Sequence, residues 1–266
     1  MSDLLEASKI GAQNEFYDAY LYDANIDNGP RVDTVYQQLL ASNTDGVVEF
    51  GCGTGTLLLS LARNGTPTLG VDRSEQMLTT FRRKILDLPA NAPKPSLAQA
   101  DLLTPIARTS MSVAILANEL CNHLLTREDL LTGLRNAADS VRPGGKLMLD
   151  LPRFDLQRLA TISDGRGGTP QHRGIFPIEG GHLQIWEVAS YDPWSGHLSA
   201  MFRYEILGSE DQLVRTYQRT LHMHPWRLDE IVLALRAVGF AEIEVRDISS
   251  EMGHARDLVQ AWTYDG

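Results

Sequence analysis

The segment VVEFGCGTG, residues 47–55, decides the fold of this chain. Its apolar part predicts a buried strand, its glycines allow a sharp turn, and a helix is expected over Thr56–Arg63. A glycine turn also leaves room for a ligand against the main chain, and amide groups at a helix N-terminus favour negative groups such as a carboxylate. The segment therefore predicts a strand–turn–helix unit that binds a small ligand.

On the C-terminal side of this segment, short apolar runs alternate with helical patterns, as in parallel βαβ units. The further strands of the sheet are expected at 68–72, 96–101, 113–118 and 146–151. Ser74 is expected to cap the helix after the second strand. Ahead of the first strand, residues 4–23 and 31–42 have helical patterns.

Between about residues 175 and 223 the pattern changes to an alternation with period two, which indicates an antiparallel meander. Its three strands are expected at 182–191, 198–207 and 212–223. A helix at 227–238 and two strands at 241–247 and 257–264 then return to the α/β pattern. We therefore expect a core with N-terminal helices at 1–151, an inserted substrate-covering meander at 175–223, and a return to the core sheet at 224–266.

The composition of the chain argues against several classes of protein. Acidic residues number 34 and basic residues 24, which gives a net charge of −10 and argues against a nucleic-acid partner. The two cysteines, Cys52 and Cys121, lie in different motifs and predict no disulfide framework. We expect neither a signal peptide nor a membrane span, and hence a cytoplasmic protein.

Two acidic residues are expected at the ends of neighbouring strands, where doubly wound sheets bind ligands. Asp72 is placed to bind two ribose hydroxyls, and Asp101 to meet an adenine amino group. A nicotinamide-binding fingerprint would require Gly or Ala where this chain has Thr56. This mismatch argues against a dinucleotide, but nicotinamide dehydrogenases use a similar glycine turn, so the turn alone does not decide between the two ligands.

Five segments taken together resemble, in order and spacing, the successive motifs of class I S-adenosylmethionine-dependent methyltransferases. They are VVEFGCGTG, VDRSEQML (71–78), QADLL (99–103), ILANELCNHL (115–124) and VRPGGKLMLDL (141–151). The closest resemblance is to bacterial small-molecule enzymes, among them amino-sugar N,N-dimethyltransferases and glycine N-methyltransferase-like enzymes. It implies an α/β Rossmann-like, doubly wound seven-stranded sheet of order 3-2-1-4-5-7-6 whose last strand is antiparallel, with an antiparallel insertion after strand five.

The resemblance also implies a set of residues that bind the cofactor. Tyr17 and Tyr20 would cover it, Glu49, Gly51, Cys52 and Gly53 would line its methionine part, Asp72 the ribose, Asp101 and Leu102 the adenine, and Asn118 the sulfonium end. Many relatives carry an apolar residue at the position of Arg73, and Met77 is the candidate to replace that contact with adenine.

Several of these residues have simpler interpretations. Cys52 is favoured as a small apolar filler over a redox group, and the tyrosines could serve only helix packing. His123 is the candidate catalytic base, with a buried structural histidine as the equal alternative. A metal site is not expected, although the histidines invite one, namely His222, His224 and His254.

These observations predict a methyltransferase that uses S-adenosylmethionine for in-line transfer to a small molecule, with N-methylation favoured over O-methylation. Positioning and exclusion of water supply most of the acceleration in such a reaction, so no fixed catalytic triad is needed. The alternatives are a nicotinamide-dependent oxidoreductase and a module that binds the cofactor without methylating. A homodimer is left open.

Overall fold

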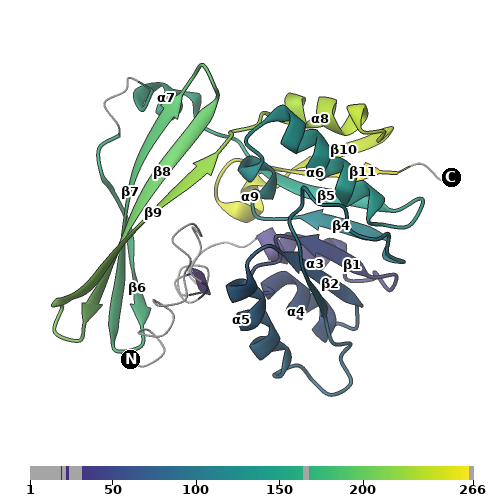
Figure 1. Cartoon of the computed structure of the whole chain (residues 1–266), viewed down its shortest axis with the longest axis horizontal. Coiled ribbons are helices and arrows are strands. Elements are labelled where there is room, and N and C mark those ends of the chain that lie inside the picture. Colours follow the sequence, from purple (N-terminus) through teal and green to yellow (C-terminus); the bar gives the residue numbers. More distant parts are fainter. Residues whose placement is uncertain (1–18, 20–21, 24–31, 164–167, 264–266) are drawn as a thin grey trace. The chain divides into compact units, whose positions relative to one another are not determined.

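The computed structural model describes residues 19, 22–23, 32–163 and 168–263 of the chain (Figure 1). The chain divides into two compact units. One consists of Pro30–Arg153 and Trp226–Gly266, and the other is built mainly from Phe154–Pro225. None of the helices in the described parts is long and apolar enough to cross a membrane.

A seven-stranded sheet forms the centre of the first unit. Its strands are β1 (Val47–Phe50), β2 (Thr68–Asp72), β3 (Ser96–Gln99), β4 (Val113–Leu116), β5 (Lys146–Pro152), β10 (Glu242–Asp247) and β11 (Arg256–Trp262). The first five pair in parallel, and β11 runs antiparallel to both of its neighbours, β5 and β10. β1 is buried throughout, as expected of a central parallel strand with both faces covered.

The order of the strands is β10-β11-β5-β4-β1-β2-β3. The labels run through the whole chain and include four strands of the second unit, so β10 and β11 are the sixth and seventh strands of this sheet. The prediction, 3-2-1-4-5-7-6, numbers the strands of this sheet alone. Counted within this sheet alone and read from the β3 edge, the seven strands follow the predicted order. The order reverses between β1 and β4, which is where a doubly wound sheet opens a crevice for a ligand.

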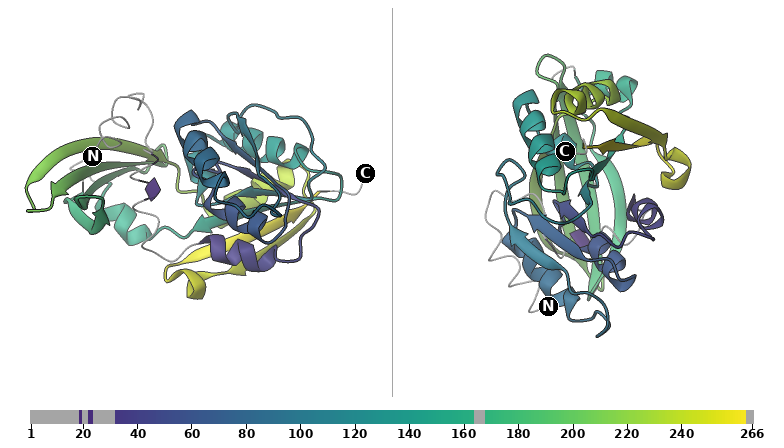
Figure 2. Two further views of the ribbon diagram at one scale, coloured as in Figure 1. Left: turned by 90° about the horizontal axis from the view of Figure 1, so that it is seen from below. Right: turned by 90° about the vertical axis from the view of Figure 1, so that its right-hand side faces the viewer.

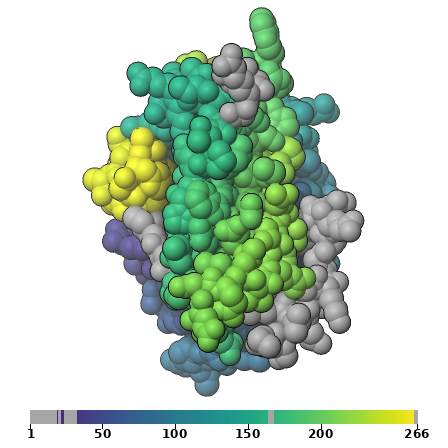
Figure 3. All heavy atoms as spheres, turned by 90° about the vertical axis from the view of Figure 1, so that its left-hand side faces the viewer, coloured from purple at the N-terminus to yellow at the C-terminus, as the bar shows by residue number. Residues whose placement is uncertain are grey.

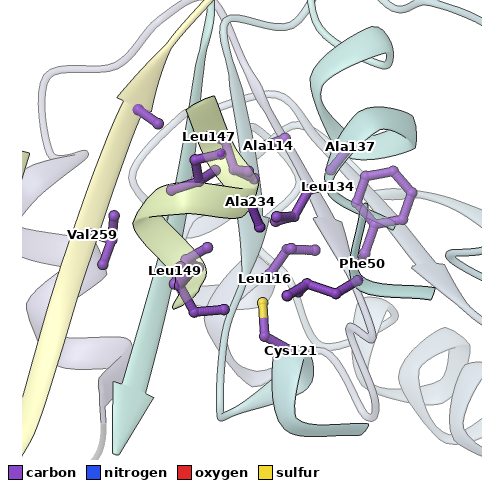
Figure 4. Packing of buried hydrophobic residues seen from close by; sticks show 14 of the residues in the cluster. Phe50, Ala114, Leu116, Cys121, Leu134, Ala137, Leu147, Leu149, Ala234 and Val259 are labelled. Atoms are coloured by element: carbon purple, nitrogen blue, oxygen red, sulfur yellow. The ribbon is translucent and has the colours of Figure 1, made fainter. Parts of the chain in front are cut away.

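Helices cover both faces of this sheet (Figures 1 and 2). They are α3 (Val32–Leu39), α4 (Thr56–Arg63), α5 (Glu75–Ile85), α6 (Arg127–Asp139), α8 (Leu228–Ala237) and the short α9 (Ser249–Met252). α3, α4, α5 and α9 supply side chains to one apolar cluster, whereas α6 and α8 supply the other. In Figure 4, Leu134 and Ala137 of α6 lie beside Phe50 and Leu116 of the sheet.

Ser74 caps α5 as predicted, because its hydroxyl accepts a hydrogen bond of 3.3 Å from the amide of Met77. Thr126 caps α6 in the same way, through the amide of Asp129 at 3.0 Å. The first of these caps fixes where the chain leaves β2, directly after Asp72.

The second unit is a four-stranded antiparallel sheet with one short helix, α7 (Leu156–Thr161). Its strands, in spatial order, are β6 (Gln171–Ile178), β7 (Gly181–Asp192), β8 (His197–Gly208) and β9 (Leu213–Met223). Figure 3 shows one face of this sheet in green. Buried side chains alternate along β7 and β8, so one face of the sheet carries the apolar cluster.

The prediction of three strands in this region was wrong by one, because β6 begins at Gln171 and pairs with β7. β6 is an edge strand with a register shift between His172 and Gly174, and it contains Pro177. Proline and glycine interrupt the alternating pattern but are tolerated at a sheet edge, so the sequence pattern concealed the strand. Helices α7 and α9 were also not predicted.

Candidate cofactor and active site

The candidate site lies where the parallel strands of the first unit end. β1, β2, β3, β4 and β5 run in one direction, so their carboxyl ends lie at one edge of the sheet. The loops that follow them contain most of the predicted site residues. This is the edge where open α/β sheets bind ligands.

The glycine turn between β1 and α4 has the left-handed backbone that its glycines allow. Gly51, Gly53 and Gly55 adopt φ angles of 65°, 54° and 84°, which favour glycine. A Cβ atom on Gly55 would lie 2.2 Å from the Phe81 ring, and one on Gly51 would lie 2.8 Å from Leu120. The turn therefore packs against α5 on one side and against the segment after β4 on the other.

Asp72, at the end of β2, connects the glycine turn to the start of α5. Its Oδ2 accepts a hydrogen bond of 2.8 Å from the Gly53 amide, and its Oδ1 accepts one of 2.8 Å from the Ser74 amide. These bonds hold a half-buried carboxylate at the end of the strand, beside the glycine turn. A carboxylate offers about four acceptor positions, so one held in this way can still bind a ligand hydroxyl.

Glu49 is the most perturbed acid of the site. Its side chain is 3% exposed, and its Oε2 accepts no hydrogen bond from the described residues. Burial raises the pKa of Glu49 well above its ordinary value, and the carboxylates of Asp33, Asp72 and Asp150 raise it further. A buried acid in this state favours a cationic ligand group, which would supply the missing partner.

The loop after β3 holds the residues predicted at the adenine. Asp101 is exposed, and its Oδ1 accepts a hydrogen bond of 2.9 Å from the Leu103 amide. Leu102 is buried, and its carbonyl accepts a hydrogen bond of 2.8 Å from the Asn136 side chain of α6. The main chain at Leu102 is thus fixed by a side chain that the sequence did not indicate.

β4 ends in an unusual corner. Asn118 and Glu119 adopt φ angles of 55° and 65°, although neither is glycine, and the 3-10 helix η1 (Leu120–His123) follows. The side chain of Asn118 is exposed. Both corner amides donate to Asp150 of β5, at 2.8 Å and 3.3 Å. Asn118 therefore lies at the predicted edge, in a conformation that its surroundings impose.

His123 ends η1 and is half-buried. Burial lowers the pKa of His123, the Glu119 carboxylate opposes this by raising it, and the Arg73 guanidinium lowers it further. These two influences come from the ends of β4 and β2, so His123 lies at the same edge as Asp72. Its imidazole is neutral at neutral pH, which is the state that a general base requires.

The remaining predicted residues are described by their exposure and packing. Arg73 is exposed, Met77 is buried within α5, and Cys52 is buried against Gly70 of β2. Burial raises the pKa of the Cys52 thiol, which suits the apolar filler. The predictions for Tyr17 and Tyr20 lie outside the described residues.

Comparison with known families agrees with this geometry. Residues 47–145 match the family model of a methyltransferase domain. The Bacillus subtilis (strain 168) protein YqeM, whose name assigns it provisionally to the methyltransferases, is 28% identical over 108 residues. That alignment covers 40% of this chain and 41% of YqeM, so the chain spans about two fifths of that relative's length. The segment matched by the family model, residues 47–145, contains the glycine turn and every predicted site residue from Glu49 to His123.

Solved structures share the fold over nearly the whole chain. DesVI of Streptomyces venezuelae superposes with a TM-score of 0.71 at 17% identity, over 94% of this chain and 99% of DesVI. CalS10 of Micromonospora echinaspora, an amino pentose methyltransferase solved with S-adenosylmethionine bound, gives 0.64 at 18% identity, over 97% and 96%. These likenesses establish a Rossmann-like methyltransferase fold.

Three buried residues beside the candidate site were missed by sequence reasoning. Tyr36 of α3 and Arg256 of β11 each donate a hydrogen bond to Asp150 of β5. One signal was available, because Asp150 is an acid inside the apolar strand KLMLDL and a buried acid requires partners. The partners themselves are more than 100 residues away in sequence, at separations of 114 and 106.

Two of the histidines considered for a metal site bond to other residues. β9 ends at Met223, so His222 lies on this strand and His224 lies beyond it. His222 bonds instead to His197 at 3.0 Å, and His254 accepts a hydrogen bond of 3.1 Å from Arg256. Among the described residues, no group of three or more potential ligands could hold a metal ion.

Proposed function

We propose that this protein is an S-adenosylmethionine-dependent methyltransferase that methylates a nitrogen of a small-molecule acceptor. The predicted cofactor, S-adenosylmethionine, is confirmed by the methyltransferase-domain match, and CalS10, which shares the fold, was solved with it bound. The acceptor class and the choice of nitrogen rest on the resemblance to amino-sugar and glycine N-methyltransferases.

One observation carries the proposal, namely the way in which Asp72 and Glu49 flank the glycine turn. Asp72 accepts a hydrogen bond from the Gly53 amide, and a carboxylate in this position suits the hydroxyls of a ribose. Glu49 is buried, and one of its oxygens has no partner among the described residues, which suits the α-ammonium group of the methionine part. The residues present therefore fit the cofactor.

When bound, S-adenosylmethionine supplies an electrophilic methyl group. The protein then has to orient the acceptor, exclude water and receive a proton, because an amine must present a free lone pair to the methyl carbon. His123 is the candidate that receives this proton, since its ring is neutral at neutral pH. The expected partner is a small molecule, with neither nucleic acid nor membrane involved, and the expected compartment is the cytoplasm.

Calorimetric titration with S-adenosylhomocysteine and with NADH tests which cofactor the protein binds. We expect S-adenosylhomocysteine to bind and NADH not to bind. Asp72→Ala should weaken S-adenosylhomocysteine binding by about 1.5–3 kcal/mol, since it removes charge-assisted hydrogen bonds to the ribose. Asp87→Ala is the matched control, because Asp87 is an exposed acid in the turn after α5.

The reverse preference, with NADH bound and S-adenosylhomocysteine not, would identify a nicotinamide oxidoreductase instead. Full affinity in a folded Asp72→Ala variant would remove Asp72 from the site. Screening amines and phenols with methyl-labelled cofactor then identifies the acceptor, and binding without any transfer would leave only the cofactor-binding module.

A further inference from the structure

The corner at Asn118 and Glu119 is held by a buried polar network. Two successive residues other than glycine adopt the left-handed conformation there. Such a conformation is unfavourable for residues other than glycine and persists only where the surrounding structure fixes it. Strained backbone of this kind is concentrated at functional sites.

Asp150 of the neighbouring strand β5 provides the fixation. Its Oδ1 accepts the Asn118 amide at 2.8 Å, and its Oδ2 accepts the Glu119 amide at 3.3 Å. Because one carboxylate binds two successive amides, it fixes the orientation of the peptide unit between them. The two amides would not align on one acceptor if the corner were extended.

Asp150 is itself held from two further elements. The Tyr36 hydroxyl of α3 donates to its Oδ1 at 3.0 Å, and the Arg256 guanidinium of β11 donates to its Oδ2. Tyr36 and Asp150 are 0% exposed and Arg256 is 4% exposed, so these groups are withdrawn from water. Charges buried in this way stabilise a particular geometry when they are paired, and are strongly destabilising when one partner is removed.

Arg256 also binds the corner directly. Its second nitrogen donates to the Glu119 carboxylate, so both the backbone and the side chain of Glu119 are tied to the same network. The His254 ring accepts a hydrogen bond of 3.1 Å from the Arg256 Nε, which orients the guanidinium. Four elements, α3, β4, β5 and β11, thus meet at the corner (Figure 1).

The corner in turn contacts the candidate cofactor site. Leu120, the residue after Glu119, lies so close to Gly51 that a Cβ atom there would be 2.8 Å away. Asp150 is also near enough to Glu49 to act on it electrostatically. The network lies behind the corner, whereas the exposed Asn118 side chain is the one predicted at the sulfonium end of the cofactor.

We propose that Tyr36, Asp150 and Arg256 are positioning residues that hold Asn118 in place against the cofactor. This inference rests on the proposed function, since it assigns the network to the S-adenosylmethionine site. A network that served only the fold would raise stability without acting through Asn118. The two roles differ in one measurable respect, the coupling between a network residue and Asn118 in cofactor binding.

A double-mutant cycle measures this coupling. The variants are Tyr36→Phe, which removes one hydroxyl from the network, Asn118→Ala, and the double variant, each titrated calorimetrically with S-adenosylhomocysteine. Tyr36→Phe avoids leaving an unpaired buried charge, unlike changes at Asp150 or Arg256. Ser140→Ala is the matched control, because it removes a buried hydroxyl that donates to the Ala137 carbonyl at 2.7 Å, at the C-terminal end of α6.

We expect Tyr36→Phe to weaken binding about threefold to tenfold, the equivalent of one hydrogen bond, and the double variant to bind no more weakly than Asn118→Ala alone. Hydrogen exchange at the amides of Asn118 and Glu119 should accelerate in Tyr36→Phe and not in Ser140→Ala. The melting temperature should fall in both Tyr36→Phe and Ser140→Ala.

Two results would overturn the inference. In the first, Tyr36→Phe melts at a lower temperature yet binds S-adenosylhomocysteine like the unaltered protein. In the second, the loss of affinity in the double variant equals the product of the losses in the two single variants, so the two positions are not coupled. Either result would leave the network as a purely structural feature while the proposed function stands. If the unaltered protein binds no S-adenosylhomocysteine, the proposed function itself is wrong and this inference is lost with it.

Discussion

At the scale of single residues, the acids of the site have opposite environments. Asp72 is satisfied by two backbone amides, whereas Glu49 is buried with an oxygen that lacks a partner in the described structure. Burial raises the pKa of Glu49, so Glu49 resists ionisation until a cation arrives. Glu49 therefore costs stability in the free protein and is suited to binding the cofactor.

Glu49→Gln tests this cost. The folded protein holds the Glu49 proton more tightly than the unfolded chain does, because burial raises its pKa. The contribution of Glu49 to the free energy of unfolding is therefore fully present below the ordinary carboxyl pKa, and declines as pH rises through the raised pKa. Glu49→Gln should remove this decline and stabilise the protein at neutral pH by on the order of 1 kcal/mol.

The same variant should bind S-adenosylhomocysteine about tenfold more weakly or worse, since it loses a charged partner for the α-ammonium group. Urea denaturation at pH 5 and pH 8, with titration of the cofactor product, measures both effects. Glu128→Gln is the control, because Glu128 is exposed on α6. A variant that is destabilised and binds normally would show that Glu49 is structural.

His123 is tested by the dependence of kcat on pH. Because burial lowers the pKa of His123 below its ordinary value of about 6.5, the acidic limb of kcat should lie below that pH. His123→Ala and His123→Gln should lose about 10²–10⁴-fold, with activity restored at high pH where the amine deprotonates in water. The exposed His182, changed to Gln, is the control. A loss of about tenfold or less with the acidic limb unmoved would make His123 a packing or orienting residue.

At the scale of elements, local patterns predicted most of the fold. The strands of the parallel sheet, the cap at Ser74 and the antiparallel last strand all follow from apolar periodicity, turn chemistry or the resemblance. β6 was missed because its glycine and proline interrupt the alternation. The network of Tyr36, Asp150 and Arg256 could not be predicted, because its members are far apart in sequence and no local pattern pairs them.

The meander's apolar face carries a prediction at this scale. Phe202 and Tyr204 of β8 share that face with ring centroids 6.2 Å apart, whereas Met201 lies on the opposite face and is exposed. If this face binds the acceptor, Phe202→Leu should raise the acceptor's KM about threefold to tenfold and leave the affinity for S-adenosylhomocysteine unchanged. Met201→Leu is the matched control. If Phe202→Leu raises the acceptor's KM and weakens S-adenosylhomocysteine binding by the same factor, the meander is a structural scaffold.

At the scale of the whole molecule, the two units have separate cores. The two apolar clusters of the first unit draw on residues between 35 and 151 and between 226 and 261, whereas those of the second draw on residues between 154 and 223. The ends of the first unit are also anchored within it. The Arg153 amide donates to the Ala255 carbonyl at 2.9 Å, and the buried Trp226 donates to the Leu124 carbonyl at 2.9 Å.

Replacing residues 154–225 by a flexible glycine–serine linker tests whether cofactor binding belongs to the first unit alone. Because both cut ends keep their anchors and neither apolar cluster of that unit loses a member, the shortened protein should still unfold cooperatively. It should bind S-adenosylhomocysteine within about fivefold of the full chain and transfer no methyl group to the acceptor. Circular dichroism melting and calorimetry on both proteins measure this. A shortened protein without a cooperative transition, or one that folds but does not bind, would show that the inserted sheet completes the cofactor site as well as serving the acceptor.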